Sequence, residues 1–303
     1  MASDTRPLPR VVVVTRPTEY QQLLARHATH GQAAFFLTTR GQSIEPVEAR
    51  HDRFETARAQ VVAAIPQKWR RSEVDRAELA RFLFEPNDIV VVLGQDGLVA
   101  NAAKYLGDGQ PLIGVNPDAE RFEGMLVRHD PAEIADLYAD VHGGRAPFEL
   151  RTMVECRLDD GQRLIALNEI YLGHSTHQSA RYDLSVGSAA EYQSSSGLIV
   201  ATGTGQSGWA RSIRLERHSE LDVPAPTDPR LTLFVREAWP SVESHAELTE
   251  AVIENAPACI TSRMEAGGVA FGDGIESDRL DLPWGSRATL GVAAERLTLV
   301  ARR

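Results

Sequence analysis

The segment Asp88–Leu93 (DIVVVL), followed by Gly94-Gln95-Asp96-Gly97, most constrains the fold of this 303-residue chain. Apolar, β-branched residues without alternation are typical of a strand that is buried on both faces of a parallel sheet. Open α/β sheets bind ligands beyond the carboxyl ends of their strands. We therefore expect Asp96 to lie at a ligand-binding edge, before a helix over residues 98–106 whose N-terminus attracts anions. The alternative is that Asp96 only caps this helix.

The first half of the chain alternates strand-like and helix-like segments, a pattern typical of an α/β domain with a parallel sheet. Both kinds of segment are recognised by their hydrophobic spacing and their Gly and Pro boundaries. We expect strands at residues 11–14, 33–37, 89–93 and 111–116, helices at 19–27, 52–65, 74–84, 98–106 and 131–141, and a basic loop at 67–72 with an exposed Trp69.

The pattern of apolar residues changes at residues 143–147 (GGRAP). This segment is typical of a turn or a domain boundary. Beyond this point the apolar runs are short, and turn residues separate them. This pattern indicates a mostly antiparallel β-sandwich with one helix over residues 207–216. The sequence therefore predicts two domains, an α/β domain over residues 1–146 and a β-rich domain over residues 147–303.

Charge and cysteine content exclude several classes of protein. The chain has 42 acidic and 32 basic residues, a net charge of -10, which gives it no electrostatic attraction to nucleic acid or to anionic membranes. Cys156 and Cys259 have no metal-ligand spacing, although a single disulfide between them is left open. No stretch is long enough for a signal or membrane span. We expect a cytoplasmic protein without nucleic-acid or membrane partners.

Two segments of the second half carry polar or small residues at strand ends. Asn168-Glu169 follows an apolar run, and its amide and carboxylate can bind a base or a ribose; the alternative is an ordinary turn. The strand at Leu198–Ala201 leads into residues 202–209 (TGTGQSGW), whose hydroxyl and backbone N–H groups suit phosphate or ribose. The alternative for this second segment is a flexible loop.

The ordered set of segments resembles the NAD kinase family. That family carries a GGDGT motif, an Asn-Glu pair and a GDG…TPTGSTAYS segment in this order. The matching segments here are GQDG at 94–97, LIGVN at 112–116, NE at 168–169 and SGLIVATGTGQSGW at 196–209, and VAFGDG at 269–274 is similar to a late FDG segment of the family. The resemblance spans residues 89–212 and, more loosely, the whole chain.

This resemblance implies a Rossmann-like α/β domain, a β-sandwich domain and a homodimer or homotetramer. The implied reaction is phosphorylation of the 2′-hydroxyl of the adenosine ribose of NAD by ATP or polyphosphate with Mg²⁺. Asp96 matches the catalytic aspartate, and no metal-ligating residue is assigned. The implied nucleotide-binding residues are Gly94, Gln95, Gly97, Leu98, Asn116, Asn168, Glu169, Ser196, Thr202, Thr204, Gly205, Ser207, Gly208, Trp209 and Ser212.

Several residues depart from the family's motifs. Gln95 stands where the family has Gly, Leu98 where it has Thr, Ser196 where it has Asp, and Gly208-Trp209 where it has Ala-Tyr. Trp209 is either a base-stacking residue or a core aromatic. These departures keep two alternatives open: a kinase for a different nucleotide or sugar-like acceptor, and a catalytically silent, nucleotide-binding regulatory homologue.

Overall fold

The computed structural model describes residues 7–107, 109–121 and 123–302, and contacts between Cα atoms divide the chain into two compact units. The first unit comprises the chain up to Glu149 together with the segment from Thr298 onward, and the second comprises Leu150–Leu297. The predicted domains, 1–146 and 147–303, stay predictions, because compactness does not test whether each part folds independently.

The first unit is built on a parallel sheet with the strand order β2-β1-β3-β4, and the end of β16 pairs with β4. The central strands are buried on both faces, as the unbroken apolar runs predicted. The bounds are β1 Arg10–Thr15, β2 Arg70–Asp75, β3 Asp88–Leu93, β4 Pro111–Val115 and β16 Arg287–Val300.

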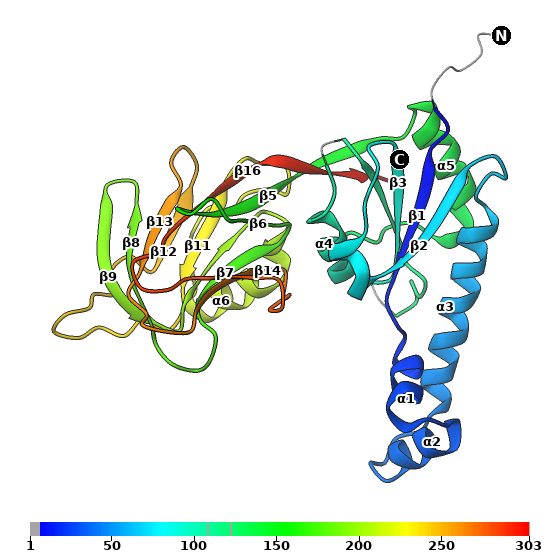
Figure 1. Ribbon diagram of the computed structural model, residues 1–303, viewed down its shortest axis with the longest axis horizontal. Helices are drawn as coiled ribbons and strands as arrows, with labels where there is room; N and C mark the ends of the chain where they lie inside the picture. Colours follow the sequence, from blue (N-terminus) through cyan, green and yellow to red (C-terminus); the bar gives the residue numbers. More distant parts are fainter. Residues whose placement is uncertain (1–6, 108, 122, 303) are drawn as a thin grey trace. The chain divides into compact units, whose positions relative to one another are not determined.

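Helices α3 and α5 cover one face of this sheet (Figure 1). Ala57 and Val61 of α3 and Ile134 and Tyr138 of α5 pack against the valines of β1 and β3 in one buried cluster. The bounds are α1 Glu19–His27, α2 His30–Thr38, α3 Glu45–Ala63, α4 Asp96–Ala103 and α5 Ile134–Gly143, with short 3-10 helices at Arg76–Arg81 and Pro131–Glu133.

The strand predicted at residues 33–37 is wrong, because this segment lies in α2. The side chain of Thr29 caps α2 by accepting a hydrogen bond from the backbone N–H of Gln32. Ala33 and Leu37 lie one helical turn apart and are buried together. A short apolar run fits both periods, so here the cap and the tertiary contacts decide for a helix.

The loop predicted at residues 67–72 is also wrong. Its second half begins β2, which pairs in parallel with β1 along its whole length. Trp69 is half-buried and meets the ring of Tyr138 edge-on, with centroids 6.1 Å apart. The helix predicted at 74–84 is reduced to the 3-10 helix Arg76–Arg81. β2 is an edge strand. Its charged residues are tolerated there because one side of an edge strand faces solvent.

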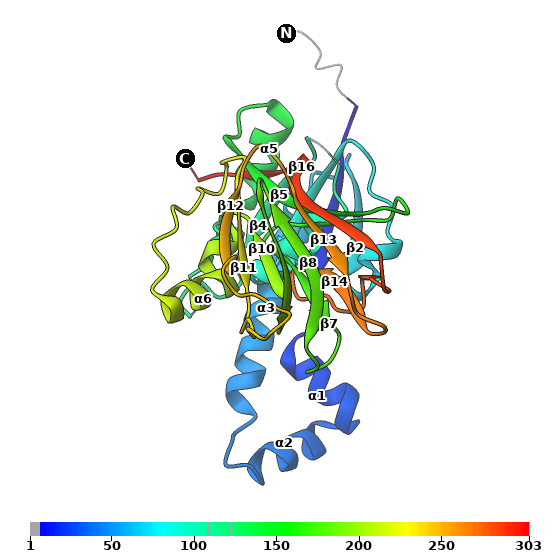
Figure 2. The same cartoon turned by 90° about the vertical axis from the view of Figure 1, so that its left-hand side faces the viewer.

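The second unit contains two antiparallel sheets, as predicted (Figure 2). One has the order β12-β11-β10-β7-β14-β15; the other runs β16-β13-β8-β9, and β5 joins β6 to β16. The bounds are β5 Phe148–Leu158, β6 Arg163–Ala166, β7 Glu169–His174, β8 Ala180–Val186, β9 Ala189–Ser195, β10 Leu198–Ala201, β11 Leu231–Val235, β12 Glu250–Ile253, β13 Ala258–Ser262, β14 Gly268–Gly272 and β15 Arg279–Asp281.

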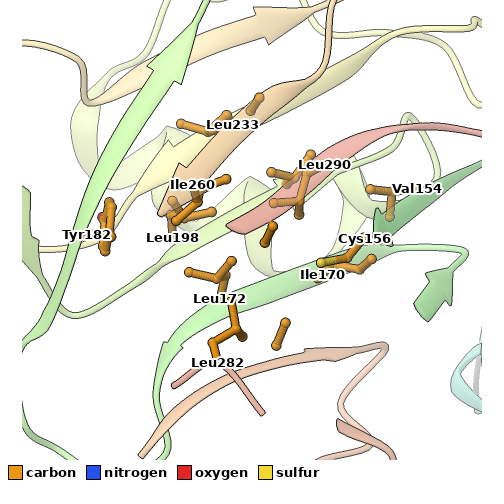
Figure 3. Close-up of a cluster of buried hydrophobic side chains, with 14 of the residues drawn as sticks. Val154, Cys156, Ile170, Leu172, Tyr182, Leu198, Leu233, Ile260, Leu282 and Leu290 are labelled. Carbon is orange, nitrogen blue, oxygen red and sulfur yellow. The ribbon is translucent and has the colours of Figure 1, made fainter. Parts of the chain in front are cut away.

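The core of the second unit lies between its sheets, where Ile170, Leu172 and Leu198 meet Tyr182 and Ile260 (Figure 3). Residues of a strand alternate between its two faces, so Tyr171 points to the outer face. There it joins Ala210 and Ile213 of α6, Trp209–Arg217. No helix in the described ranges combines the length and apolarity needed to cross a membrane.

Gly114 in β4 allows a neighbouring segment to approach the sheet closely. A Cβ at this position would collide with the backbone carbonyl of Leu126 and would lie 2.9 Å from the Cα of Val127. We expect Gly114→Ala to lower the free energy of unfolding by about 1–3 kcal/mol, because the obstacle is backbone. Urea unfolding followed by circular dichroism measures this change.

Gly31→Ala is the matched control for this experiment. Gly31 lies in α2, and a Cβ there would meet no atom within 4 Å. Alanine is the better helix former, so this change should raise stability by up to about 1 kcal/mol. Equal stability of Gly114→Ala and the wild type would contradict the role given to Gly114.

Candidate functional site

The carboxylate of Asp96 holds the segment Met125–Val127 at the carboxyl edge of the first sheet. Asp96 is the first residue of α4 and is half-buried. Its Oδ1 accepts hydrogen bonds from the backbone N–H groups of Leu126 (2.8 Å) and Val127 (3.0 Å), and its Oδ2 accepts one from Met125 (2.9 Å). Asp96 is therefore fixed in position by backbone groups.

A cavity of about 360 Å³ opens at the same edge of the first unit. It lies where the chain order of the strands reverses, between β1 and β3, which is the usual ligand site of an open α/β sheet. Arg16, Gly94 and Asn116, which follow β1, β3 and β4, line it together with side chains of α3. The guanidinium of Arg16 donates a hydrogen bond of 2.7 Å to Oε1 of Gln95.

The other predicted residues of this edge have different surroundings. Gly97 is exposed on α4, whereas Leu98 is buried in the core and offers no polar group to a ligand. Asn116 is 6% exposed, and its Oδ1 accepts a hydrogen bond from the backbone N–H of Asp118. Gln95, Gly94 and Asn116 line the cavity, and Asp96 lies beside Gln95 in the chain.

In the second unit, the carboxylate of Asp273 holds the turn that carries Asn168 and Glu169. Its Oδ2 accepts a hydrogen bond from the backbone N–H of Leu167 (2.8 Å), and its Oδ1 accepts those of Asn168 (2.7 Å) and Glu169 (3.4 Å). The backbone N–H of Asp273 donates to the carbonyl of Glu169 in return. Asp273 thus fixes the backbone from which both predicted side chains project.

The loop after β10 packs directly on this turn. The hydroxyl of Thr202 donates a hydrogen bond to the carbonyl of Leu167 (2.5 Å) and accepts the N–H groups of Thr204 and Gly205. The backbone N–H of Thr202 donates to the carbonyl of Asn168. A Cβ at Gly205 would collide with that same carbonyl. The structure therefore brings together two motifs that lie more than 30 residues apart.

The carboxyl group of Glu169 resists ionisation at this site. Burial is the main cause, and the neighbouring carboxylate of Asp273 adds to it; together they raise the pKa of Glu169 to about 8. Glu169 is therefore largely protonated near neutral pH. In that form its carboxyl group can donate one hydrogen bond and still accept others, which suits ribose hydroxyl groups.

Ser196 lies at the opposite end of β10 from this cluster. Ala201 pairs with Glu169, whereas Leu198 pairs with Leu172, so the register separates the two ends. Five residues of strand correspond to roughly 16 Å. Within one chain, the structure does not bring Ser196 to the Asn168-Glu169 turn.

Trp209 begins α6 and packs against the outer face of the six-stranded sheet. Its ring stacks on that of Tyr171, with centroids 5.9 Å apart and planes 15° apart, and the guanidinium of Arg236 lies 4.9 Å from its centre. Trp209 therefore has a packing role, and it also lines a small pocket of about 230 Å³. Ser207, Gly208 and Ser212 are exposed, and the two hydroxyl groups donate to backbone carbonyls one turn back.

Four residues of these clusters were not predicted from the sequence as site residues. Asp273 lies in the VAFGDG segment, which is similar to the late FDG segment of the family, but no role was predicted for it. Arg151 is 2% exposed and donates to the hydroxyl of Thr204 (3.2 Å). Arg16 and His51 line the cavity of the first unit. Arg16 follows a buried strand as Asp96 does, and that signal was sufficient to find it.

The fold is that of the NAD kinases. It matches the crystal structure of yeast NADH kinase complexed with NADH at a TM-score of 0.64, with 15% identity, over 99% of this chain and 85% of that chain. It also matches an NAD kinase from Archaeoglobus fulgidus in complex with ATP, at a TM-score of 0.58 and 17% identity, over 96% of this chain and 93% of that chain.

Sequence comparison gives the same relationship. The chain is 33% identical over 132 residues to the NAD kinase of Azoarcus sp. (strain BH72), and 27% identical over 299 residues to the human protein NAD kinase 2, mitochondrial. The matches cover 41% and 80% of this chain, but only 44% and 65% of those relatives, less than two thirds of their length. No protein-family model matches the chain. This protein is a divergent relative of the NAD kinases, as its motifs predicted.

We expect the stability of the protein to fall as pH rises from about 4.5 to 8, because of Glu169. An unfolded glutamate loses its proton near pH 4.3, whereas the folded protein retains it up to about pH 8. The folded state binds the additional proton in this window, so its stability falls by at most about 1.4 kcal/mol per pH unit. Glu169→Gln should show a flatter curve of melting temperature against pH.

The matched control is Glu216→Gln, on the exposed face of α6. Its melting curve should follow that of the wild type between pH 5 and 8.5. A wild-type slope that Glu169→Gln leaves unchanged would rule out a protonated Glu169 in the folded state.

Proposed function

We propose that this protein is a phosphotransferase that transfers the γ-phosphoryl group of ATP to the 2′-hydroxyl of the adenosine ribose of NAD. The position of Asp96 carries this proposal: its carboxylate is fixed by backbone N–H groups at the carboxyl end of a buried parallel strand. The NAD kinase relatives and the shared fold support it. Polyphosphate is the second phosphoryl donor to test.

Asp96 is the proposed acceptor of the proton from the attacking hydroxyl group. The hydroxyl oxygen forms a bond to the γ-phosphorus, the bond from this phosphorus to ADP breaks, and ADP leaves with the electron pair. Such a transfer depends mainly on positioning and electrostatics. Oδ2 of Asp96 accepts one hydrogen bond in the described part of the chain, and a carboxylate oxygen has room for another partner.

The residues at this edge are compatible with Mg²⁺ that arrives with the nucleotide. Mg²⁺ keeps several waters and binds through one or two carboxylates and the phosphates of the substrate, rather than through a full protein cage. Among the described residues, no group of three or more His, Cys, Asp and Glu side chains could hold a metal ion. Asp96 is the carboxylate proposed to face it, and the ion would neutralise charge on the transferred phosphoryl group.

The cluster around Asp273 is the proposed site for the nucleotide acceptor. Asn168 offers both donors and acceptors, and protonated Glu169 offers a hydroxyl that can bind a ribose oxygen. The loop from Thr202 to Gly205 fixes their backbone. We propose that these residues bind the base or a ribose of the nucleotide.

Two observations favour a different acceptor of the phosphoryl group in place of NAD. Gln95 is bound to Arg16, and Trp209 is packed against Tyr171, at positions where the family carries Gly and Tyr. Both departures change groups near the proposed nucleotide sites, which supports a kinase for a different nucleotide or sugar-like acceptor. The homodimer or homotetramer and the cytoplasmic location stay predictions.

The purified protein should convert NAD to a product heavier by one phosphoryl group when it is incubated with Mg-ATP. We expect Asp96→Asn to lower this rate by about 10²–10⁴-fold, because the amide cannot accept the proton. Mass spectrometry detects the product, and a coupled NADP assay gives the rate.

Asp130→Asn is the matched control, because the carboxylate of Asp130, like that of Asp96, accepts a backbone N–H group in the first unit, here as the cap of the 3-10 helix Pro131–Glu133. It should retain wild-type activity. Binding of NAD without any product would favour the regulatory alternative, and phosphorylation of another nucleotide or sugar in place of NAD would favour the different acceptor. Full activity of Asp96→Asn would remove Asp96 from the mechanism.

A further inference from the structure

Arg16 differs from several arginines of the first unit, whose guanidinium groups form ion pairs with carboxylates. Arg10, Arg50 and Arg58 each form an ion pair with a carboxylate, as do Arg53, Arg70, Arg128 and Arg145. Among the described residues, the guanidinium of Arg16 has the neutral amide of Gln95 as its partner. Within the described ranges its positive charge is therefore not neutralised by an ion pair, although the net charge of the chain is -10.

Arg16 lies where its positive charge can act on a ligand in the cavity of the first unit. Arg16 follows β1 and Gln95 follows β3, and these strands are parallel neighbours with Val14 opposite Val92. Their carboxyl ends form the point where strand order reverses, and both side chains line the 360 Å³ cavity there. Figure 1 shows α1 continuing from the end of β1 and lying beside α3, which supplies another wall.

Gln95 is placed to hold Arg16 rather than to cap a helix. It occupies the N-cap position of α4, but its side chain makes no capping hydrogen bond. Its amide oxygen instead accepts from Arg16. A neutral acceptor orients the guanidinium without cancelling its charge, so the free donors of its fork remain available for an anion.

We propose that the cavity at the β1–β3 switch point binds the phosphate chain of a nucleotide, that Arg16 is its anion-binding residue, and that Gln95 positions Arg16. This inference rests on the proposed phosphotransferase function and assigns a subsite to it. Arginine binds phosphate oxygens in a fork geometry, and the 360 Å³ cavity leaves room for a chain of phosphates. The phosphates belong either to the triphosphate of the donor or to the diphosphate of a dinucleotide acceptor.

The test is isothermal titration of the whole protein with inorganic tripolyphosphate, Mg-ATP and NAD. Arg16→Gln removes the charge and keeps a hydrogen-bonding side chain, and it should weaken tripolyphosphate binding at least tenfold. Gln95→Ala should weaken it two- to fivefold, because the charge remains but its orientation is lost. The loss with Arg16→Gln should shrink as salt is raised, since ions screen an exposed charge.

Arg58→Gln is the matched control. Arg58 lies on α3, pairs with Glu73 and does not line the cavity, so the affinity for tripolyphosphate should stay within twofold of the wild type. Tripolyphosphate binding by Arg16→Gln within twofold of the wild type would overturn the inference. An equal loss with Arg58→Gln would also overturn it, because the effect would then be one of general charge.

The titrations also separate the two sources of phosphate. A loss for Mg-ATP with unchanged NAD binding assigns the subsite to the donor, and a loss for NAD assigns it to the acceptor. Failure of the proposed function is distinguishable: tripolyphosphate binding that depends on Arg16, without any phosphorylated product, refutes the function and leaves the subsite standing. An active enzyme in which Arg16→Gln changes neither KM nor kcat refutes the subsite alone.

Discussion

Three consecutive backbone N–H groups bonded to one carboxylate form the interaction on which both candidate clusters depend. Asp96 accepts the N–H groups of residues 125–127 in the first unit, and Asp273 accepts those of residues 167–169 in the second. A charged acceptor makes stronger hydrogen bonds than a neutral one and satisfies several donors at once. Each carboxylate therefore fixes a short stretch of backbone: residues 125–127, which are irregular, and Leu167-Asn168 together with the first residue of β7.

Small residues make these arrangements possible. Gly114 lets the segment held by Asp96 lie against β4, and Gly205 lets the loop after Thr202 lie against the carbonyl of Asn168. In both places a side chain would collide with backbone, which cannot move without breaking the hydrogen bonds around it. The chemical groups of the candidate site thus depend on residues that carry no chemistry themselves.

The departures from the NAD kinase motifs have structural roles in this chain. Gln95 accepts a hydrogen bond from the guanidinium of Arg16. Leu98, which stands where the family has Thr, is buried in the core. Trp209 stacks on Tyr171 at the start of α6. The charges of two residues also matter. Arg16 has no ion pair within the part of the chain that the structure describes, and Glu169 retains its proton in the other cluster. Both favour a polar, anionic ligand over an apolar one.

The sequence by itself determined the buried strands, the two types of architecture and the order of the motifs, because unbroken apolar runs and glycine-flanked polar residues are local signals. It failed at residues 33–37 and 67–72, where a cap and an edge pairing decide between helix, strand and loop. Only the tertiary structure placed Asp273 under the Asn168-Glu169 turn and Arg16 beside Gln95, and separated Ser196 from that turn. Strand order and register set these distances, and both arise from pairings between residues far apart in the chain.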